Sequence, residues 1–209
     1  MSELQKADFS YIGTDADMGQ LHRVLSETLR QSGHPLPGPE HRRLLNLACG
    51  RADETGVLAD VFGKDAGRLD IFGADLRAPE IEEARTRWKS DPDSGIHTQF
   101  ESGDGLQILD NLDDDQQFDV AFLRHQNFWN GNDLWQGMFD RSLHRLTGDG
   151  MLVITSYFDL EHRQACAALK RLGAIQVANF RNPKSRLISA KHQKSVDRHI
   201  AVFRKPTTD

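Results

Sequence analysis

The sequence is poor in cysteine and has no long apolar run. Its 209 residues include only two cysteines, Cys49 and Cys166, which are too few for a disulfide framework or a cysteine-based zinc site. We expect both to be reduced thiols. No stretch approaches the ~20 apolar residues that span a bilayer, and residues 1–10 lack the apolar centre of a signal peptide. We therefore expect a cytoplasmic protein with no membrane partner.

The chain also lacks an excess of positive charge. Its formal net charge is −5, which argues against nucleic acid as the partner of the whole protein, since such proteins are usually basic. The nine histidines are scattered, without a His-x-x-x-His spacing or a carboxylate cluster, so we expect no metal site. With 38% hydrophobic and 27% charged residues, the composition is that of an ordinary globular protein.

Two regions are expected along the chain. Residues 1–40 should form a helical extension that ends at Gly33, followed by a connector in which three prolines exclude regular helix. Residues 41–209 should form an α/β domain, because short apolar runs alternate there with helical patterns. The expected strands are residues 44–47, 69–74, 98–101, 118–123 and 151–155, and two final runs, 174–180 and 199–203, should pair as an antiparallel hairpin.

The expected helices follow these strands. One spans residues 52–62, one opens at Pro79, one is capped by Asn132 or Asp133, and one is capped by Asp159. The third should turn Leu134, Met138 and Leu146 toward the sheet, before a turn at residues 147–150. On the last helix, Glu161 and His162 are interpreted as solvated neighbours.

Small residues follow the first expected strand. Ala48, Gly50 and Ala52 let the backbone turn sharply and approach a ligand, and the next helix aims its free N–H groups at the same place. This turn predicts a cofactor cradle, with a plain strand-to-helix turn as the alternative.

Polar residues follow the next three strands in order. Asp75 ends the second strand, Asp104 follows the third between two glycines, and Arg124 and His125 follow the fourth. With the turn at residues 46–52, this series resembles the class I S-adenosylmethionine-dependent methyltransferases over about residues 44–205. The resemblance implies a three-layer αβα Rossmann-like sandwich whose seven-stranded sheet is mostly parallel, with an antiparallel C-terminal hairpin strand.

The resemblance also implies the cofactor, S-adenosylmethionine. Asp75 would accept hydrogen bonds from the ribose hydroxyls, and Asp104 would contact the adenine amino group; a helix cap and an ordinary turn are the respective alternatives. Where the family has an acidic residue and two flanking glycines, this chain has Asn46, Ala48 and Ala52, and alanine fits where the backbone torsion is ordinary. The implied cofactor-binding residues are Asn46, Ala48, Cys49, Gly50, Asp75, Leu76, Asp104, Gly105 and Arg124.

Catalysis in such a protein depends on alignment and on the exclusion of water. His125 is the candidate catalytic base, because its ordinary pKa of ~6.5 suits proton transfer at neutral pH; the alternative is a local hydrogen-bonding role. Substrate walls are expected from Tyr11, residues 128–135, residues 157–158 and the terminal hairpin. The basic segment 181–205 is interpreted as a solvated loop, with an anionic acceptor or RNA as the alternative.

Three functions remain open from the sequence. The leading hypothesis is methyl transfer from S-adenosylmethionine to an oxygen or nitrogen of a small molecule, by a monomer or homodimer. The alternative is a non-catalytic relative that keeps the fold as a binding or interaction module. A nicotinamide-dependent oxidoreductase is third, because the acidic residue after the third strand and the terminal hairpin suit that architecture poorly.

Overall fold

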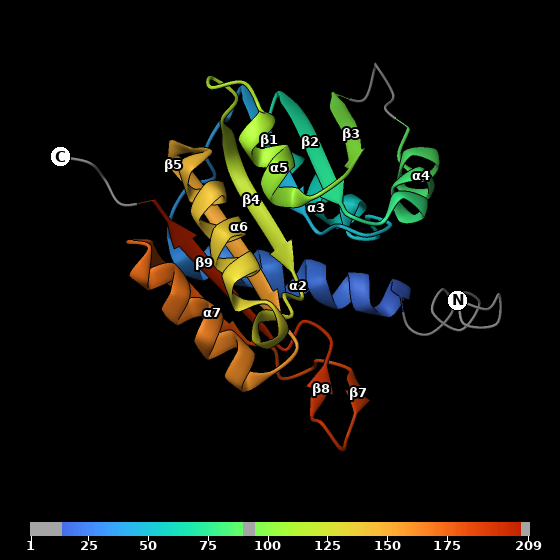
Figure 1. Ribbon diagram of the computed structural model, residues 1–209, viewed down its shortest axis with the longest axis vertical. Helices are drawn as coiled ribbons and strands as arrows, with labels where there is room; N and C mark the ends of the chain where they lie inside the picture. Colours follow the sequence, from blue (N-terminus) through green and yellow to red (C-terminus); the bar gives the residue numbers. More distant parts are fainter. Residues whose placement is uncertain (1–13, 90–94, 206–209) are drawn as a thin grey trace.

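A computed structural model describes residues 14–89 and 95–205 of the chain (Figure 1). Its centre is a seven-stranded sheet in the order β3-β2-β1-β4-β5-β9-β6. The first five of these strands run parallel, and β9 pairs antiparallel with both β5 and β6. The strands are β1 (His41–Leu47), β2 (Arg68–Asp75), β3 (Ile96–Ser102), β4 (Phe118–Arg124), β5 (Leu146–Ser156), β6 (Ile175–Arg181) and β9 (His199–Arg204).

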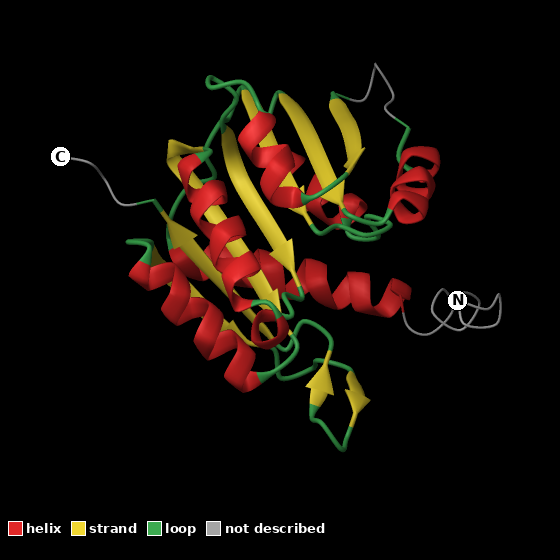
Figure 2. Ribbon diagram, viewed as in Figure 1, coloured by secondary structure: helices red, strands yellow, loops and turns green. Residues whose placement is uncertain are grey.

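Helices cover both faces of this sheet (Figure 2). One face carries α2 (Thr14–Ser32) and α3 (Thr55–Gly63), with α4 (Ala78–Arg87) packed beside them against β3. The other face carries α5 (Gly105–Asn111), α6 (Asn132–His144) and α7 (Asp159–Arg171). A short 3-10 helix, η1 (Phe128–Asn130), precedes α6, and a small hairpin of β7 (Leu187–Ser189) and β8 (Lys194–Ser195) precedes β9. The predicted three-layer architecture and its antiparallel hairpin are confirmed.

The central strands are apolar on both sides because helices cover both faces. On β1, Leu44 packs into the core beneath α2 and α3, whereas Leu45 and Leu47 pack into the core beneath α5, α6 and α7. From α2, Leu21 and Leu25 are fully buried in the first of these cores. Each such side chain contributes roughly 1.5–3 kcal/mol by leaving water. The division expected at residue 40 stays a prediction, and Tyr11 lies outside the described residues.

Four expectations about local structure are wrong. Leu146 and the expected turn at residues 147–150 belong to β5, because Leu146 already pairs with Phe118 of β4. Leu134 is largely exposed, since α6 turns Met138 and Phe139 to the core instead. Asp159 is the first residue of α7 rather than its cap, and Asn132 and Asp133 likewise lie inside α6, which Gly131 precedes. The helix α5 was not predicted at all.

Glu161 and His162 are also buried rather than solvated. Helix α7 turns a broad stripe to the sheet, and residues four positions before Ala165 and Cys166 lie on that same stripe. Glu161 and His162 therefore continue the apolar face of α7, and their interpretation as a solvated pair is wrong. None of the helices in residues 14–89 and 95–205 combines the length and apolarity that crossing a bilayer demands.

Candidate cofactor and reaction site

The turn after β1 has an unusual backbone. Ala48, Gly50 and Ala52 have φ angles of +54°, +56° and +54°, all in the left-handed region. Glycine enters this region freely, whereas an alanine there costs roughly 1–2 kcal/mol. The condition under which alanine would fit at positions 48 and 52, an ordinary backbone torsion, is therefore not met. Strain of this kind concentrates at ligand-binding turns, because the surrounding structure holds it in place.

Asp75 fastens this turn to the end of β2. The amide of Gly50 donates to Asp75 Oδ2 over 2.8 Å, and the amide of Arg77 donates to Oδ1 over 2.9 Å. The Arg77 guanidinium also donates to both oxygens, over 2.9 and 3.2 Å. Burial opposes ionisation of this carboxyl, but the bonds from Arg77 and Gly50 prevail and lower the pKa of Asp75. The buried end of β2 therefore presents an ionised acceptor.

Arg77 lies directly over the turn. A Cβ at Gly50 would be 2.8 Å from Arg77 Nη2, so the guanidinium occupies the space beside the glycine. The Arg77 side chain is 58% exposed, whereas that of Asp75 is 5% exposed. The guanidinium can therefore turn into solvent, but the buried carboxylate that it leaves needs another donor in its place. Next to it, Leu76 is 74% exposed, which leaves an apolar side chain open to solvent at the edge of the turn.

The third strand end carries Asp104 and Gly105. Asp104 Oδ1 accepts hydrogen bonds from the amides of Leu106 and Gln107, over 2.8 and 3.4 Å, and so caps α5, whose first residue is Gly105. Asp104 therefore has a local structural role as the cap of α5. Cys49 is buried, and burial raises the pKa of its thiol, so it is unreactive.

A chain of buried polar groups runs from β1 to β4. Asn46 Nδ2 donates to Glu54 Oε1 over 2.7 Å, and Glu54 Oε2 lies 3.5 Å from Arg124 Nη1. Burial raises the pKa of Glu54. Within the described part of the chain, the buried Asn46 Oδ1 has no hydrogen-bond partner. An unpaired buried oxygen costs roughly 1–3 kcal/mol, so this atom is a ready acceptor for a ligand donor.

Arg124 ends in a buried pair with Asp197. Arg124 Nε and Nη2 donate to the two oxygens of Asp197 over 3.0 and 2.7 Å, and Thr155 Oγ1 donates to Oδ1 over 2.8 Å. Burial opposes ionisation of Asp197, but Arg124 and His125 hold the pKa of this carboxyl far below its usual range. Asp197 was missed as a site residue. Its signal in the sequence was that it is the sole acidic residue within the basic segment 181–205.

His125 completes this cluster at the end of β4, with φ at +59°. Its ring stacks on Tyr157 with centroids 3.8 Å apart, and Nε2 lies 2.8 Å from Asp197 Oδ1. Burial lowers the pKa of His125, which keeps the imidazole neutral at pH 7. The same Nε2 lies 3.1 Å from the Asp197 amide nitrogen, whose N–H donates to it. The amide contact needs a lone pair on Nε2, whereas the carboxylate contact needs a proton on Nε2 and leaves the lone pair on Nδ1, where a proton can be taken up.

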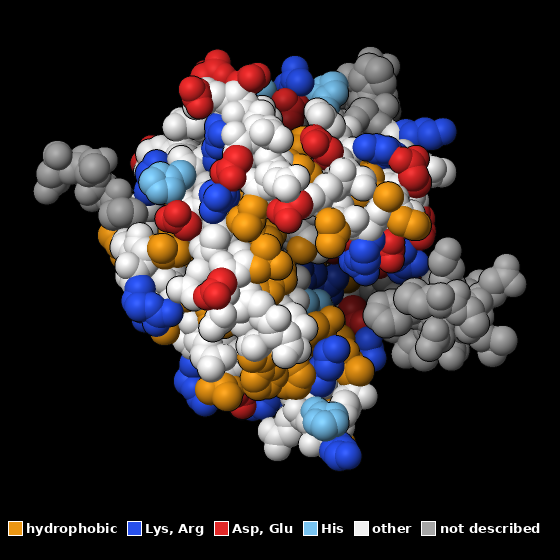
Figure 3. Space-filling model, viewed as in Figure 1, with side chains coloured by type: hydrophobic (Ala, Val, Ile, Leu, Met, Phe, Trp, Pro, Cys, Tyr) orange, Lys and Arg blue, Asp and Glu red, His pale blue; other side chains and the backbone are white. Residues whose placement is uncertain are grey.

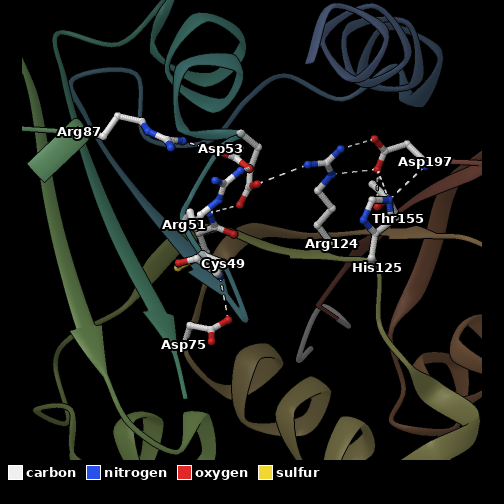
Figure 4. Close-up of polar contacts among 12 residues, drawn as sticks. Cys49, Arg51, Asp53, Asp75, Arg87, Arg124, His125, Thr155 and Asp197 are labelled. Atoms are coloured by element: carbon white, nitrogen blue, oxygen red, sulfur yellow. Dashed lines mark hydrogen bonds and ion pairs between the residues drawn. The ribbon is translucent and has the colours of Figure 1, made fainter. Parts of the chain in front are cut away.

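The two halves of the site lie on either side of the turn in Figure 4, with Asp75 on one side and Arg124, His125 and Asp197 on the other. Figure 3 shows a hollow where β4 ends in Figure 1, with Lys or Arg and His side chains deep inside it. Of the expected substrate walls, Phe128 is core, stacked on Phe139. No group of His, Cys, Asp and Glu in residues 14–89 and 95–205 has the arrangement of a metal site.

Comparisons with known proteins agree with this architecture. No protein-family model matches the sequence, and no curated protein matches it. Among solved structures, an S-adenosylmethionine-dependent methyltransferase from Clostridium acetobutylicum matches 95% of this chain and 98% of its own, with a TM-score of 0.64 at 12% identity.

Two further structures match over a similar share of the chain. DesVI from Streptomyces venezuelae has a TM-score of 0.63 at 13% identity, with 99% of both chains covered. The N-methyltransferase NodS from Bradyrhizobium japonicum has a TM-score of 0.58 at 17% identity, covering 93% of this chain and 99% of its own. The strand order, the strand-end residues and these matches together show that the chain has the fold of S-adenosylmethionine-dependent methyltransferases.

Proposed function

We propose that this protein binds S-adenosylmethionine at the carboxyl ends of β1 to β4 and transfers its methyl group to an oxygen or nitrogen of a small molecule. One observation carries the proposal: a buried, ionised Asp75 ends β2 directly beside the left-handed turn at Gly50. In an open α/β sheet, ligands bind outside the carboxyl ends of the strands, where such a carboxylate accepts hydrogen bonds from two hydroxyl groups.

The residues present suit this cofactor. Asp75 would accept from the ribose diol once Arg77 turns away, and the exposed Leu76 would cover a face of the adenine. The unpaired Oδ1 of Asn46 would take a donor from the amino-acid end, near the turn. When bound, the cofactor supplies an electrophilic methyl group on a positively charged sulfur. Alignment and dry surroundings would account for much of the rate.

His125 is the proposed base within this site. In the tautomer in which Nε2–H donates to Asp197 Oδ1, Nδ1 carries the lone pair and would receive the proton of a hydroxyl or amine acceptor. A developing imidazolium would be stabilised by the carboxylate 2.8 Å away. Asp197 would act as a positioning residue, because its contact is with His125 rather than with the acceptor.

A non-catalytic relative is the second candidate. It is favoured by one observation, that both oxygens of Asp75 already accept hydrogen bonds from Gly50 and Arg77. A nicotinamide-dependent oxidoreductase is disfavoured, because β9 enters the sheet antiparallel between β5 and β6, unlike the order of dinucleotide-binding domains.

Calorimetry with S-adenosylmethionine and S-adenosylhomocysteine tests the proposal. We expect the wild type to bind both and Asp75→Ala to bind roughly 5- to 150-fold more weakly, from a loss of about 1–3 kcal/mol. Asp70→Asn is the matched control, since Asp70 lies on the same strand but pairs with Arg68 and His41, away from the turn. No binding of either compound at millimolar concentration would contradict the proposal.

A further inference from the structure

A second cavity, of about 400 Å³, lies between η1, the start of α7 and the β7–β8 hairpin. It is separate from the turn at Gly50, and the proposed cofactor site uses none of its side chains. The residues that matter for its chemistry are Trp129, Phe158, Leu160, Arg163, Lys191 and Arg198.

One side of this cavity is apolar and aromatic. Trp129 is 44% exposed and Leu160 is 45% exposed. The Trp129 ring meets the ring of Phe158 edge to face, with centroids 4.8 Å apart. Large aromatic side chains left open beside one another favour contact with another planar, apolar group. This wall therefore suits an aromatic ring.

The charged side chains of the cavity leave a surplus of positive charge. Asp159 is already neutralised, because Arg198 donates to both of its oxygens over 2.6 and 3.0 Å and His199 contacts one of them over 2.6 Å. Arg163 and Lys191 have no ion pair within the described residues, and both are exposed. Two cations without an ion pair beside an aromatic wall suit a ligand with a carboxylate, which arginine binds with two parallel hydrogen bonds.

The cavity shares a wall with the reaction site. Phe158 lines it and contacts the ring of Tyr157, with centroids 6.2 Å apart. Tyr157 in turn stacks on His125 at 3.8 Å. In Figure 3, apolar side chains gather with Lys and Arg at this lower end of the molecule. A ring held on Trp129 and Phe158 would thus lie next to the residues that enclose the proposed base.

We infer that this cavity binds an aromatic carboxylate, with its ring on Trp129 and Phe158 and its carboxylate on Arg163 and Lys191. That this molecule is the methyl acceptor rests on the proposed function. The binding itself does not, because no residue of the cofactor turn takes part in it.

Calorimetry with 2-naphthoate and its neutral counterpart 2-naphthamide, in the absence of S-adenosylmethionine, tests the inference. We expect 2-naphthoate to bind about three- to tenfold more tightly than 2-naphthamide, because two exposed ion pairs distinguish them. Binding of 2-naphthoate should weaken in 0.5 M NaCl, because exposed charges are screened by salt. The double variant Arg163→Gln, Lys191→Gln should bind 2-naphthoate about three- to tenfold more weakly, as expected for two exposed ion pairs. Trp129→Ala should weaken the binding of 2-naphthoate and of 2-naphthamide by the same factor.

Arg171→Gln is the matched control, because Arg171 is also exposed on α7 but lies at its far end, outside the cavity. It should leave the affinity for 2-naphthoate unchanged. Equal affinities for the two probes, or a double variant that binds 2-naphthoate as well as the wild type, would overturn the inference. If S-adenosylmethionine binds and 2-naphthoate does not, only this inference fails. If 2-naphthoate binds and S-adenosylmethionine does not, only the proposed function fails.

Discussion

The buried cluster around Asp197 gives a stability prediction that can be worked from its contacts. Asp197→Asn keeps the size of the side chain and tolerates its left-handed φ of +44°, but removes the charge that Arg124 pairs with. Breaking a buried pair costs roughly 3–5 kcal/mol. Arg124 keeps Glu54 at 3.5 Å, so we expect the lower end, about 3 kcal/mol. For a domain of this size the melting temperature should fall by about 6–12 °C.

Urea unfolding of wild type and variant measures this loss directly, provided that the dependence on denaturant is unchanged. Asp149→Asn is the control, because Asp149 pairs with Arg204 at 3.3 Å while its side chain is 90% exposed. That exposed pair should be worth under about 1 kcal/mol. A loss below about 1 kcal/mol for Asp197→Asn would refute the reasoning, since the pair would then behave like the exposed one.

Two further predictions concern the turn and α7. Ala48→Gly should stabilise the protein by about 0.5–1 kcal/mol in urea unfolding, because relief of the left-handed strain exceeds the added entropy of the unfolded chain; an unchanged midpoint would contradict this. Burial lowers the pKa of His162 to about 4 and raises that of Glu161 to about 7. Between about pH 4 and 6.5, His162 is protonated in the unfolded state but not in the folded state, so its contribution to the free energy of unfolding rises with pH. Between about pH 4.5 and 7, Glu161 is protonated in the folded state but not in the unfolded state, so its contribution falls as pH rises. For His162→Gln, the free energy of unfolding should fall as pH rises from 5 to 7; for Glu161→Gln, it should rise over the same range. If both variants and the wild type show parallel pH profiles in urea unfolding, neither group titrates as described.

Much of the fold was predictable because its cause is local. The apolar runs that became β1, β2, β4 and β5 are continuous, and Gly33 and Gly50 mark element ends because glycine adopts their left-handed torsions freely. The placement of Asp75 at the end of β2 was predictable in the same way, because it directly follows the apolar run of residues 69–74. These features depend on short stretches of sequence, so the residue pattern of each stretch is enough to predict them.

The rest depends on contacts between distant parts of the chain. Asp197 meets Arg124 and His125 only because β9 inserts beside β5, which no spacing in the sequence indicates. Helix α5 has seven residues, too short for a clear period, and it relies on the Asp104 cap and on packing against α6. The left-handed torsions of Ala48 and Ala52 are likewise imposed from outside, against the preference of alanine itself.

A crystal structure with bound S-adenosylhomocysteine tests the central claim most directly, because the claim is that Asp75 exchanges one partner for another. We predict that the Arg77 guanidinium leaves Asp75 and that the ribose diol takes its place, while the amide of Gly50 keeps its bond to Oδ2. The adenine should lie against Leu76. A structure in which the Asp75–Arg77 pair stays intact, with the nucleoside bound elsewhere or absent at millimolar concentration, would contradict the account.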